Sequence, residues 1–440
     1  MSMMKSSRRG LNLRQWKEQS IARPSLLHAP AGDLWLPLRR RGEEPFALTA
    51  EVGSRVERDQ PVAVCRESSR APIFAPAAGE IVSTETIPHP FFEEEVLCAV
   101  LRPEDTFPTD QTQPLNTDAI RPDEILSCCR EAGLVDELDG MPLDRKLQRA
   151  ARQGCSLLVA DALDDQPYCT SRLRTLIEQA DAVGAGTVLA ATAVGAARSC
   201  IAAYRPSSVA SHLPLEAGGV TVLELSGHYP CLPELKEQMS LWGGGIRIGA
   251  AAAAALFRAV TLCAKQHESM VTVGGPCVQT AVNFRVRTGT LAGELLERVS
   301  LRRAPGLLVV NGAMTGFAAE LGRPLPILPG ITSLLLYPEH KADASGRCVG
   351  CGRCVDVCPV GLVPALIARA VDRGGASAAR RLMAQRCIGC GCCSFVCPAG
   401  CDVSRTVSEA AEVLRMPEEN ASKGRNDAVR DVSVRPIEKD

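Results

Sequence analysis

The sequence predicts a multidomain α/β fold, in which a strand-rich N-terminal module and a parallel α/β domain precede a small mixed module and a cysteine-rich C-terminal domain. Three observations predict it. Short strand-like segments alternate with turns from residue 28 to about residue 98. Apolar runs then alternate with helical stretches from residue 123 to about residue 263, as in a sheet covered on both faces. Near the C-terminus, one cysteine spacing occurs twice. A chain of 440 residues has room for about three domains.

The first segments are a loose, basic lead-in over residues 1–25 and a β-module over residues 26–103. Within the module, residues 71–82 resemble the barrel-sandwich fold of lipoyl and biotin carriers. Such carriers present a lysine at a hairpin tip, but residues 28–98 contain no lysine. We therefore expect a structural module rather than a swinging arm. Residues 104–122 are rich in Pro, Thr, Asp and Gln and are predicted to form a linker.

The next predicted domain spans residues 123–265. Apolar runs at 156–160, 187–191 and 220–225 are typical of buried parallel strands, and residues 172–184 are typical of a helix. This alternation predicts a mostly parallel sheet with helices.

A small module follows over residues 266–340. Strand-like segments at 271–275 and 283–287 precede a helix candidate at 291–299 and a further strand at 307–310. Two strands, a helix and a strand predict a β-grasp module.

The repeated cysteine spacing indicates metal chemistry. Each run has the form C-x2-C-x2-C-x3-C-P, the spacing that ligates cubane [4Fe–4S] clusters in two-cluster ferredoxins. Glycines between the cysteines allow backbone N–H groups to turn toward the cluster sulfurs. The fourth cysteine of each run usually ligates the other cluster. We therefore assign one cluster to Cys348, Cys351, Cys354 and Cys397, and the other to Cys387, Cys390, Cys393 and Cys358.

Other uses of these thiols fit less well. Zinc usually takes two C-x2-C pairs, and a disulfide framework needs an oxidising compartment. Cys392 and Cys401 lie beside the second run and are predicted to be spare. The cluster domain is placed at residues 341–415, with a helical insert at 363–385 broken at a Gly-Gly pair, and residues 416–440 form a polar tail that we expect to be disordered.

Composition limits the function classes. The 49 basic and 50 acidic residues give a net charge of −1, which gives no reason to expect nucleic-acid binding. Twenty cysteines without a signal peptide indicate a reducing, cytoplasmic location. Arg247 and Arg258 interrupt the most apolar stretch, residues 243–264, so it is not predicted to span a membrane. Any membrane association is expected to be peripheral, through a partner.

The order of modules resembles the RnfC family of the Rnf electron-transport complex, which has soluble relatives in bacterial microcompartments and amino-acid reductases. The resemblance covers almost the whole chain. Beyond the cysteine runs, it is carried by short motifs at residues 131–135, 166–168, 228–230, 289–290 and 390–398. It implies an α/β domain that binds FMN and NADH, a soluble-ligand-binding β-grasp module, and transfer of electrons from the flavin to the clusters.

Two segments depart from that pattern. The family's flavin loop is glycine-rich so that backbone N–H groups reach a phosphate, whereas Asp136, Glu137 and Asp139 stand in this loop here. Three carboxylates would face a phosphate, and one such pair at 4 Å repels by about 4 kcal/mol at an effective dielectric constant of 20. A second family segment, normally polar, reads Ile-Gly-Ala-Ala-Ala at 248–252. The acidic pair Asp164 and Asp165 stands near the family's glutamates. FMN is therefore expected to bind weakly or not at all.

The sequence thus favours an electron-transfer protein that carries electrons through two [4Fe–4S] clusters between a reduced donor and a partner reductase or complex. The alternatives are an FMN-dependent NADH oxidoreductase component that feeds the clusters, and an assembly protein. No residue is assigned to catalysis, FMN or NADH. Expected partners are a flavoprotein, a ferredoxin-like donor or a membrane complex. Arg347, Arg353 and Arg386 flank the cluster loops and are candidates for attracting an acidic redox partner.

Overall fold

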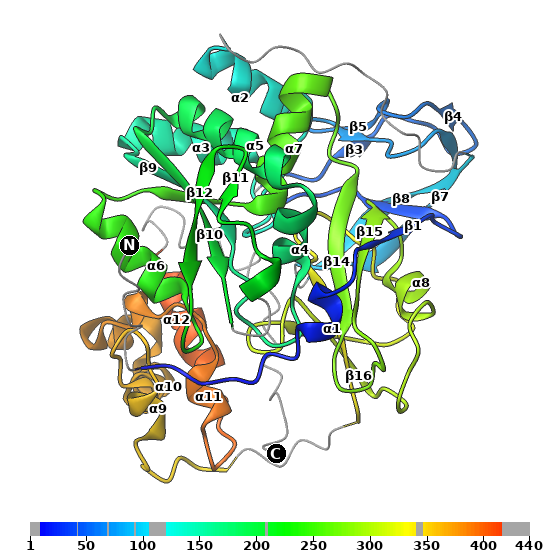
Figure 1. The fold of residues 1–440 in the computed structure, drawn as a ribbon. Coiled ribbons are helices and arrows are strands. Elements are labelled where there is room, and N and C mark those ends of the chain that lie inside the picture. Colours follow the sequence, from blue (N-terminus) through cyan, green and yellow to red (C-terminus); the bar gives the residue numbers. More distant parts are fainter. Residues whose placement is uncertain are drawn as a thin grey trace.

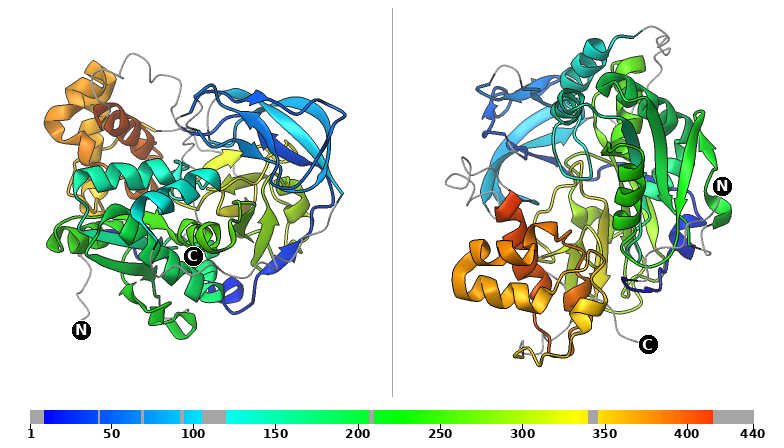
Figure 2. Two further views of the ribbon diagram at one scale, coloured as in Figure 1. Left: turned by 90° about the horizontal axis from the view of Figure 1, so that it is seen from above. Right: turned by 90° about the vertical axis from the view of Figure 1, so that its left-hand side faces the viewer.

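The computed structural model describes residues 9–41, 43–67, 70–91, 94–104, 120–206, 210–339 and 346–415. Most of the predicted linker and the whole predicted tail lie outside these ranges. In Figure 1, the N-terminal strands in blue lie at the upper right and most of the cluster domain, in orange, lies at the lower left, whereas the second view of Figure 2 shows that the last helix, in red, lies next to the N-terminal strands. The exact domain boundaries stay predictions.

The N-terminal module is a sandwich of two small antiparallel sheets, which confirms the predicted barrel-sandwich fold. Alternate residues of the long strands face one apolar core, which includes the fully buried Leu34, Ile81 and Leu101. The first sheet has the order β2 (Leu34–Pro37), β8 (Glu95–Pro103), β7 (Gly79–Pro88) and β4 (Arg55–Val56), and the second has β3 (Ala47–Leu48), β5 (Pro61–Val64) and β6 (Ile73–Phe74).

The α/β domain has a five-stranded sheet whose two faces are covered by different helices. Leu158 and Ala160 of β9 face the core formed with α2, α3, α4, α5 and α7, whereas Leu157 and Val159 face α6. All neighbouring strands are parallel except β11, an antiparallel edge strand. The strand order is β11 (Glu216–Ala217), β12 (Val220–Leu225), β10 (Arg198–Tyr204), β9 (Leu157–Ala162) and β13 (Ile246–Gly249). The helices are α2 (Pro122–Glu131), α3 (Leu143–Gln153), α4 (Ser171–Glu178), α5 (Ala180–Val194), α6 (Leu232–Leu241) and α7 (Ala250–Leu262).

One strand of this domain was predicted wrongly. Residues 187–191 lie inside α5, and the strand after it is β10, which was not predicted. A short apolar run does not by itself distinguish a buried strand from a buried helix. The composition of the helix decides the outcome, because small residues allow α5 to approach α7 closely. A Cβ on Gly186 would lie 1.8 Å from the carbonyl oxygen of Ala253 in α7.

The mixed sheet contains the three strands predicted between residues 266 and 340, together with three strands that were not predicted, and the predicted helix is also present. β1 pairs in parallel with β15, so the N-terminal segment completes the edge of a sheet built from distant residues. The order is β1 (Leu26–His28), β15 (Val282–Arg287), β14 (Glu268–Gly274), β18 (Ser333–Tyr337), β16 (Leu307–Val310) and β17 (Phe317–Ala319), with helix α8 (Ala292–Leu296).

The C-terminal domain is helical, as predicted. The predicted break lies within α10, at Gly374 and at Gly375, which has φ +66°. α10 packs on α12 through a small apolar core that includes Ile367 and Val407. The helices are α9 (Arg353–Asp356), α10 (Pro364–Ala379), α11 (Cys392–Phe395) and α12 (Val403–Arg415), with 3₁₀ turns η2 (Arg380–Leu382) and η3 (Ala384–Arg386) between α10 and α11. No helix in the described part of the chain is long and apolar enough to cross a membrane.

The lead-in is not loose where the structure describes it, which corrects the prediction for residues 9–25. Trp16 stacks on Tyr168 with ring centroids 5.0 Å apart, and Ile21 of helix α1 (Glu18–Ile21) is 1% exposed. Lys17 is fully buried and donates a hydrogen bond of 2.5 Å to the carbonyl of Gln166. The basic composition of the segment gave no indication that Trp16, Lys17 and Ile21 are buried or packed. Figures 1 and 2 show this segment, in dark blue, running from the cluster domain to the mixed sheet.

We predict that Lys17 makes the free energy of unfolding depend on pH in the alkaline range. Burial lowers the pKa of Lys17 from 10.5 to about 8. Between these values the unfolded chain holds a proton that the folded protein has lost, so the free energy of unfolding should rise from pH 8 to pH 10.5. Lys17→Met should flatten the rise. Chemical unfolding followed by circular dichroism measures it, and equal slopes in both proteins would contradict the prediction.

Candidate iron–sulfur centre and the adjoining α/β site

The two cysteine runs form matching loops. In the first, Gly350 and Gly352 have φ of +72° and +78°; in the second, Gly389 and Gly391 have φ of +67° and +76°. These left-handed conformations strongly favour glycine. A helix of four residues, α9 or α11, begins directly after the second glycine of each loop. The sequence repeat is therefore also a structural repeat.

The thiols of the second loop lie with a cysteine of the first run. Cys358 packs in one apolar cluster with Cys387 and Cys393, and Cys387 and Cys393 are each within electrostatic reach of both Cys358 and Cys390. This arrangement supports the crossed assignment of Cys358, which stays a prediction. In residues 346–415, no three potential metal-ligating side chains lie close enough to hold one metal ion. A cubane does not require that, because each of its four irons takes one cysteine.

The two loops differ in exposure. Cys348 and Cys351 are exposed, and Val349 between them is 70% exposed. In the second loop, Cys387 and Cys390 are partly buried. The first loop therefore faces solvent, and the second faces the rest of the molecule.

Tyr229 connects the second loop to the α/β domain. Its hydroxyl donates a hydrogen bond of 2.9 Å to the carbonyl of Cys390, and Cys392 packs with Tyr229, Leu11 and Met314. Gly391 lies so close to the mixed sheet that a Cβ there would be 2.4 Å from the carbonyl oxygen of Met314. Two motifs that the sequence singled out, 228–230 and 390–398, are thus in contact. Cys401, predicted to be spare, lies near the carbonyl of Gly346, at 2.9 Å.

The acidic loop at residues 136–142 does not present three carboxylates to a common point, which corrects that expectation. Lys146 of α3 lies 2.5 Å from Asp136 and 2.7 Å from Asp139. Asp136 also accepts the backbone N–H of Gly249 at 2.9 Å. Two of the three acidic side chains are therefore paired with a cation inside the protein.

Glu137 turns instead to the first turn of α7. Its Oε1 accepts the N–H of Ala251 at 2.7 Å, and its Oε2 accepts the N–H of Ala252 at 2.9 Å. Burial, and then the charge of Asp136, raise the pKa of Glu137 to about 8, while the backbone donors oppose the shift. No local pattern in the sequence indicates this contact, because Glu137 and α7 are more than one hundred residues apart.

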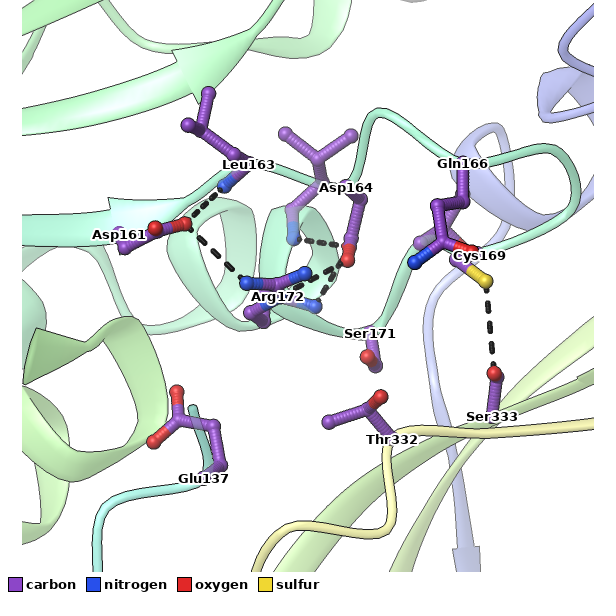
Figure 3. Close-up of polar contacts among 12 residues, drawn as sticks. Glu137, Asp161, Leu163, Asp164, Gln166, Cys169, Ser171, Arg172, Thr332 and Ser333 are labelled. Atoms are coloured by element: carbon purple, nitrogen blue, oxygen red, sulfur yellow. Dashed lines mark hydrogen bonds and ion pairs between the residues drawn. The ribbon is translucent and has the colours of Figure 1, made fainter. Parts of the chain in front are cut away.

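A second group of charges lies opposite Glu137 (Figure 3). Arg172 contacts Asp161 at 3.3 Å and Asp164 at 3.2 Å, and both carboxylates are 1% exposed. Asp164 also accepts the N–H groups of Arg172 and Leu173, at 2.8 and 3.0 Å, and so caps α4. Arg247 is a further partner of Asp161. The sequence singled out Asp164, but not its cation.

Asp165 points in another direction. It accepts the N–H of Cys231 at 2.7 Å, and burial raises the pKa of Asp165 to about 6. The two acidic residues therefore have different partners inside the protein: Asp164 pairs with Arg172 and caps α4, and Asp165 accepts the N–H of Cys231.

A cavity of about 720 Å³ lies behind the acidic loop. Its lining comes from the N-terminal sandwich, the loop, the mixed sheet and α12, including Phe74, Leu138, Phe317 and Val413. Because four distant parts of the chain contribute, no local pattern predicts it. Asp161, Asp164 and Arg172 are not among its lining residues.

Comparison with known proteins agrees with these features. Residues 5–106 match the RnfC barrel sandwich hybrid domain, and residues 340–398 match the 4Fe-4S dicluster domain. The fold and its cysteine loops thus define an iron–sulfur electron-transfer protein.

The relatives make the class more specific. The chain is 23% identical over 386 residues to the C subunit of the proton-translocating ferredoxin:NAD(+) oxidoreductase complex of Clostridium ljungdahlii, covering 83% of this chain and 84% of that one. It is 25% identical over 374 residues to the C subunit of the ion-translocating oxidoreductase complex of Vibrio cholerae serotype O1, covering 79% and 48%. The corresponding protein from Serratia proteamaculans is 26% identical over 388 residues, covering 81% and 53%. The chain is therefore RnfC-like over most of its length, and spans about half of the latter two relatives.

Among solved structures, the NAD+-reducing [NiFe]-hydrogenase in the H2-reduced state matches with a TM-score of 0.42 and 15% identity, covering 69% of this chain and 63% of that one.

We predict that Arg172→Gln destabilises the protein by about 3–5 kcal/mol, because it leaves buried carboxylates without their cation. The matched control is Arg323→Gln, which removes an exposed arginine paired with Glu320 and should change stability by less than about 0.5 kcal/mol. Chemical unfolding measures both. Similar effects of the two substitutions would show that the buried group contributes little.

Proposed function

We propose that this protein relays electrons through two [4Fe–4S] clusters between a reduced donor and a partner reductase or complex. The observation that carries the proposal is the matched pair of cysteine loops, with Cys358 of one run lying among the thiols of the other. Sharing a cysteine between runs holds two clusters in one unit and keeps them close. Each cluster would supply a carrier for one electron at a time.

The two cysteine loops differ in their exposure to solvent, and this difference suggests where electrons enter or leave the protein. The exposed Cys348–Cys351 turn is the natural contact for a soluble or membrane-bound partner, since its thiols are accessible. The second loop is held against the α/β domain by Tyr229, which fixes its backbone. We infer that electrons cross between solvent and protein at the first loop.

We further infer that the donor is a one-electron carrier or a flavoprotein. The 123–265 region is assigned to a flavoprotein-like domain and the 266–340 region to a soluble-ligand-binding β-grasp module. At the start of α7, however, the N–H groups of Gly249, Ala251 and Ala252 are bonded to the protein's own carboxyl groups. These residues do not fit a flavin phosphate. Without a flavin, no group in the described residues would divide a hydride into single electrons.

The relatives suggest the type of partner. Their names place them in proton- or ion-translocating oxidoreductase complexes. We propose that this protein is cytoplasmic and associates peripherally with such a complex or with a soluble reductase. The rival function, an FMN-dependent NADH oxidoreductase component, predicts flavin in the protein after anaerobic purification and desalting, together with NADH oxidation.

The first prediction of the proposal concerns iron. We expect about eight irons per chain, because two cubanes take eight cysteines. Cys351→Ser should remove or convert one cluster and disturb its neighbour. Cys401→Ser is the matched control and should leave the iron content unchanged. Iron and sulfide analysis of anaerobic protein measures both, and a halved iron content in Cys401→Ser would show that the ligand assignment is wrong.

The second prediction concerns the partner. Arg347, Arg353 and Arg386 are all exposed beside the cluster loops. Changing each to Glu should slow reduction by an acidic ferredoxin-like donor and flatten its dependence on salt, because steering by exposed charges is screened. Arg55→Glu, on β4 at the far end of the molecule (Figure 1), is the control and should have no effect. Unchanged rates at low ionic strength would place the docking surface elsewhere.

A further inference from the structure

We propose that Glu137 is a built-in substitute for a ligand phosphate, whose carboxyl group occupies the anion position at the start of α7 and closes that position to the phosphate of a nucleotide. The proposal deepens the flavin-free relay of the previous section. It concerns the α/β domain alone, so it can fail while the relay through the clusters stands.

The position is one that attracts anions. α7 has 13 residues, and the first N–H groups of a helix lack partners within it and carry the positive end of its dipole. Phosphates bind at such positions for this reason. Here the two oxygens of Glu137 each take one of those N–H groups, at 2.7 and 2.9 Å, so the carboxyl group bonds there as two oxygens of a phosphate would.

The space for this carboxyl group is provided by Gly249. A Cβ on Gly249 would lie 1.9 to 2.2 Å from the three carboxyl atoms of Glu137, so any other side chain would displace the carboxyl group. The backbone of Gly249 has φ −71° and ψ 153°, which any residue adopts without strain. Glycine is therefore required at this position by the carboxyl group and not by the chain's conformation.

The neighbouring charges also oppose a phosphate. Asp136 is fully buried beside Glu137 and holds the N–H of Gly249. Lys146 is bonded to Asp136 and Asp139, and Arg172, which is within electrostatic reach of Glu137, is bonded to Asp161 and Asp164. An entering phosphate would have to displace one carboxyl group, approach another, and draw a cation out of an existing pair.

Opening the position tests the proposal. In Glu137→Gly the N–H groups of Ala251 and Ala252 lose their internal partner, so inorganic phosphate should raise the thermal midpoint relative to chloride at equal ionic strength, in a saturable way. FMN should bind this variant at least tenfold more tightly than it binds the wild-type chain. The wild-type protein should show neither effect.

Two controls separate this from a general effect of removing a carboxylate. Glu137→Gln keeps a side chain of the same size in the position and should still exclude phosphate, although its amide oxygen can accept from only one of the two N–H groups. Glu124→Gly removes an exposed glutamate that accepts the N–H of Arg121 at the start of α2, and should give no phosphate response. Iron content and reduction by dithionite, measured in parallel, should match the wild type in every variant, which keeps the cluster relay under separate test.

Several results would overturn the proposal. These are stoichiometric FMN in the wild-type chain after desalting, an equal phosphate response in both proteins, or no response in a folded Glu137→Gly. If that variant does not fold, the contact with Gly249 decides the question. Gly249→Ala should lower the thermal midpoint in the wild-type chain but not in Glu137→Ala, where the methyl group has room. Equal effects in the two backgrounds would show that the carboxyl group does not occupy this position.

Discussion

A carboxylate that is buried in a protein needs hydrogen-bond donors or a paired cation, and this need determines how the loops of the α/β domain are arranged. Asp136, Asp161 and Asp164 are almost completely inaccessible to solvent. An ionised carboxylate removed from water is strongly unfavourable unless it is paired or hydrogen-bonded. Lys146 and Arg172 supply the cations, and the starts of α4 and α7 supply backbone donors to Asp164 and Asp136. The loops that would surround a ligand in an open domain are instead bonded to each other.

The bonding between these loops also affects where the second cysteine loop of the cluster domain lies. Tyr229 follows the parallel strand β12, and its hydroxyl reaches the second cysteine loop. Asp165, at the end of β9, fixes the backbone at Cys231, two residues beyond Tyr229. The position of the second loop therefore depends on loops at one edge of the parallel sheet, and internal ion pairs join residues of these loops to the helices beside them. The α/β domain in this way positions the second cysteine loop through contacts between its own residues and that loop.

The sequence predicted those parts of the fold whose signals are local. Cysteine spacing identified the cluster loops because each loop is made by one short segment, and the Gly374–Gly375 break needed no distant partner. Residues 187–191 were misassigned because an apolar run is equally suited to a strand and to a buried helix, and only the approach of α5 to α7 distinguishes them. The anchoring of Lys17 and Trp16 was missed because their partners lie about 150 residues away.

The same limit explains why the acidic loop was interpreted only in part. From sequence, Asp136, Glu137 and Asp139 were equivalent negative charges, and their number alone argued against a phosphate. In the structure these residues differ. Asp136 and Asp139 form ion pairs with Lys146, whereas Glu137 accepts hydrogen bonds from a helix that begins more than one hundred residues later. Charge repulsion between the acidic loop and a phosphate is thus a smaller part of the explanation than the occupied donors. The N–H groups that a phosphate would need already bond to Glu137. The side chain that would exclude a phosphate also makes the hydrogen bonds that a phosphate would make, so these backbone donors stay paired although the loop still lines a cavity of about 720 Å³.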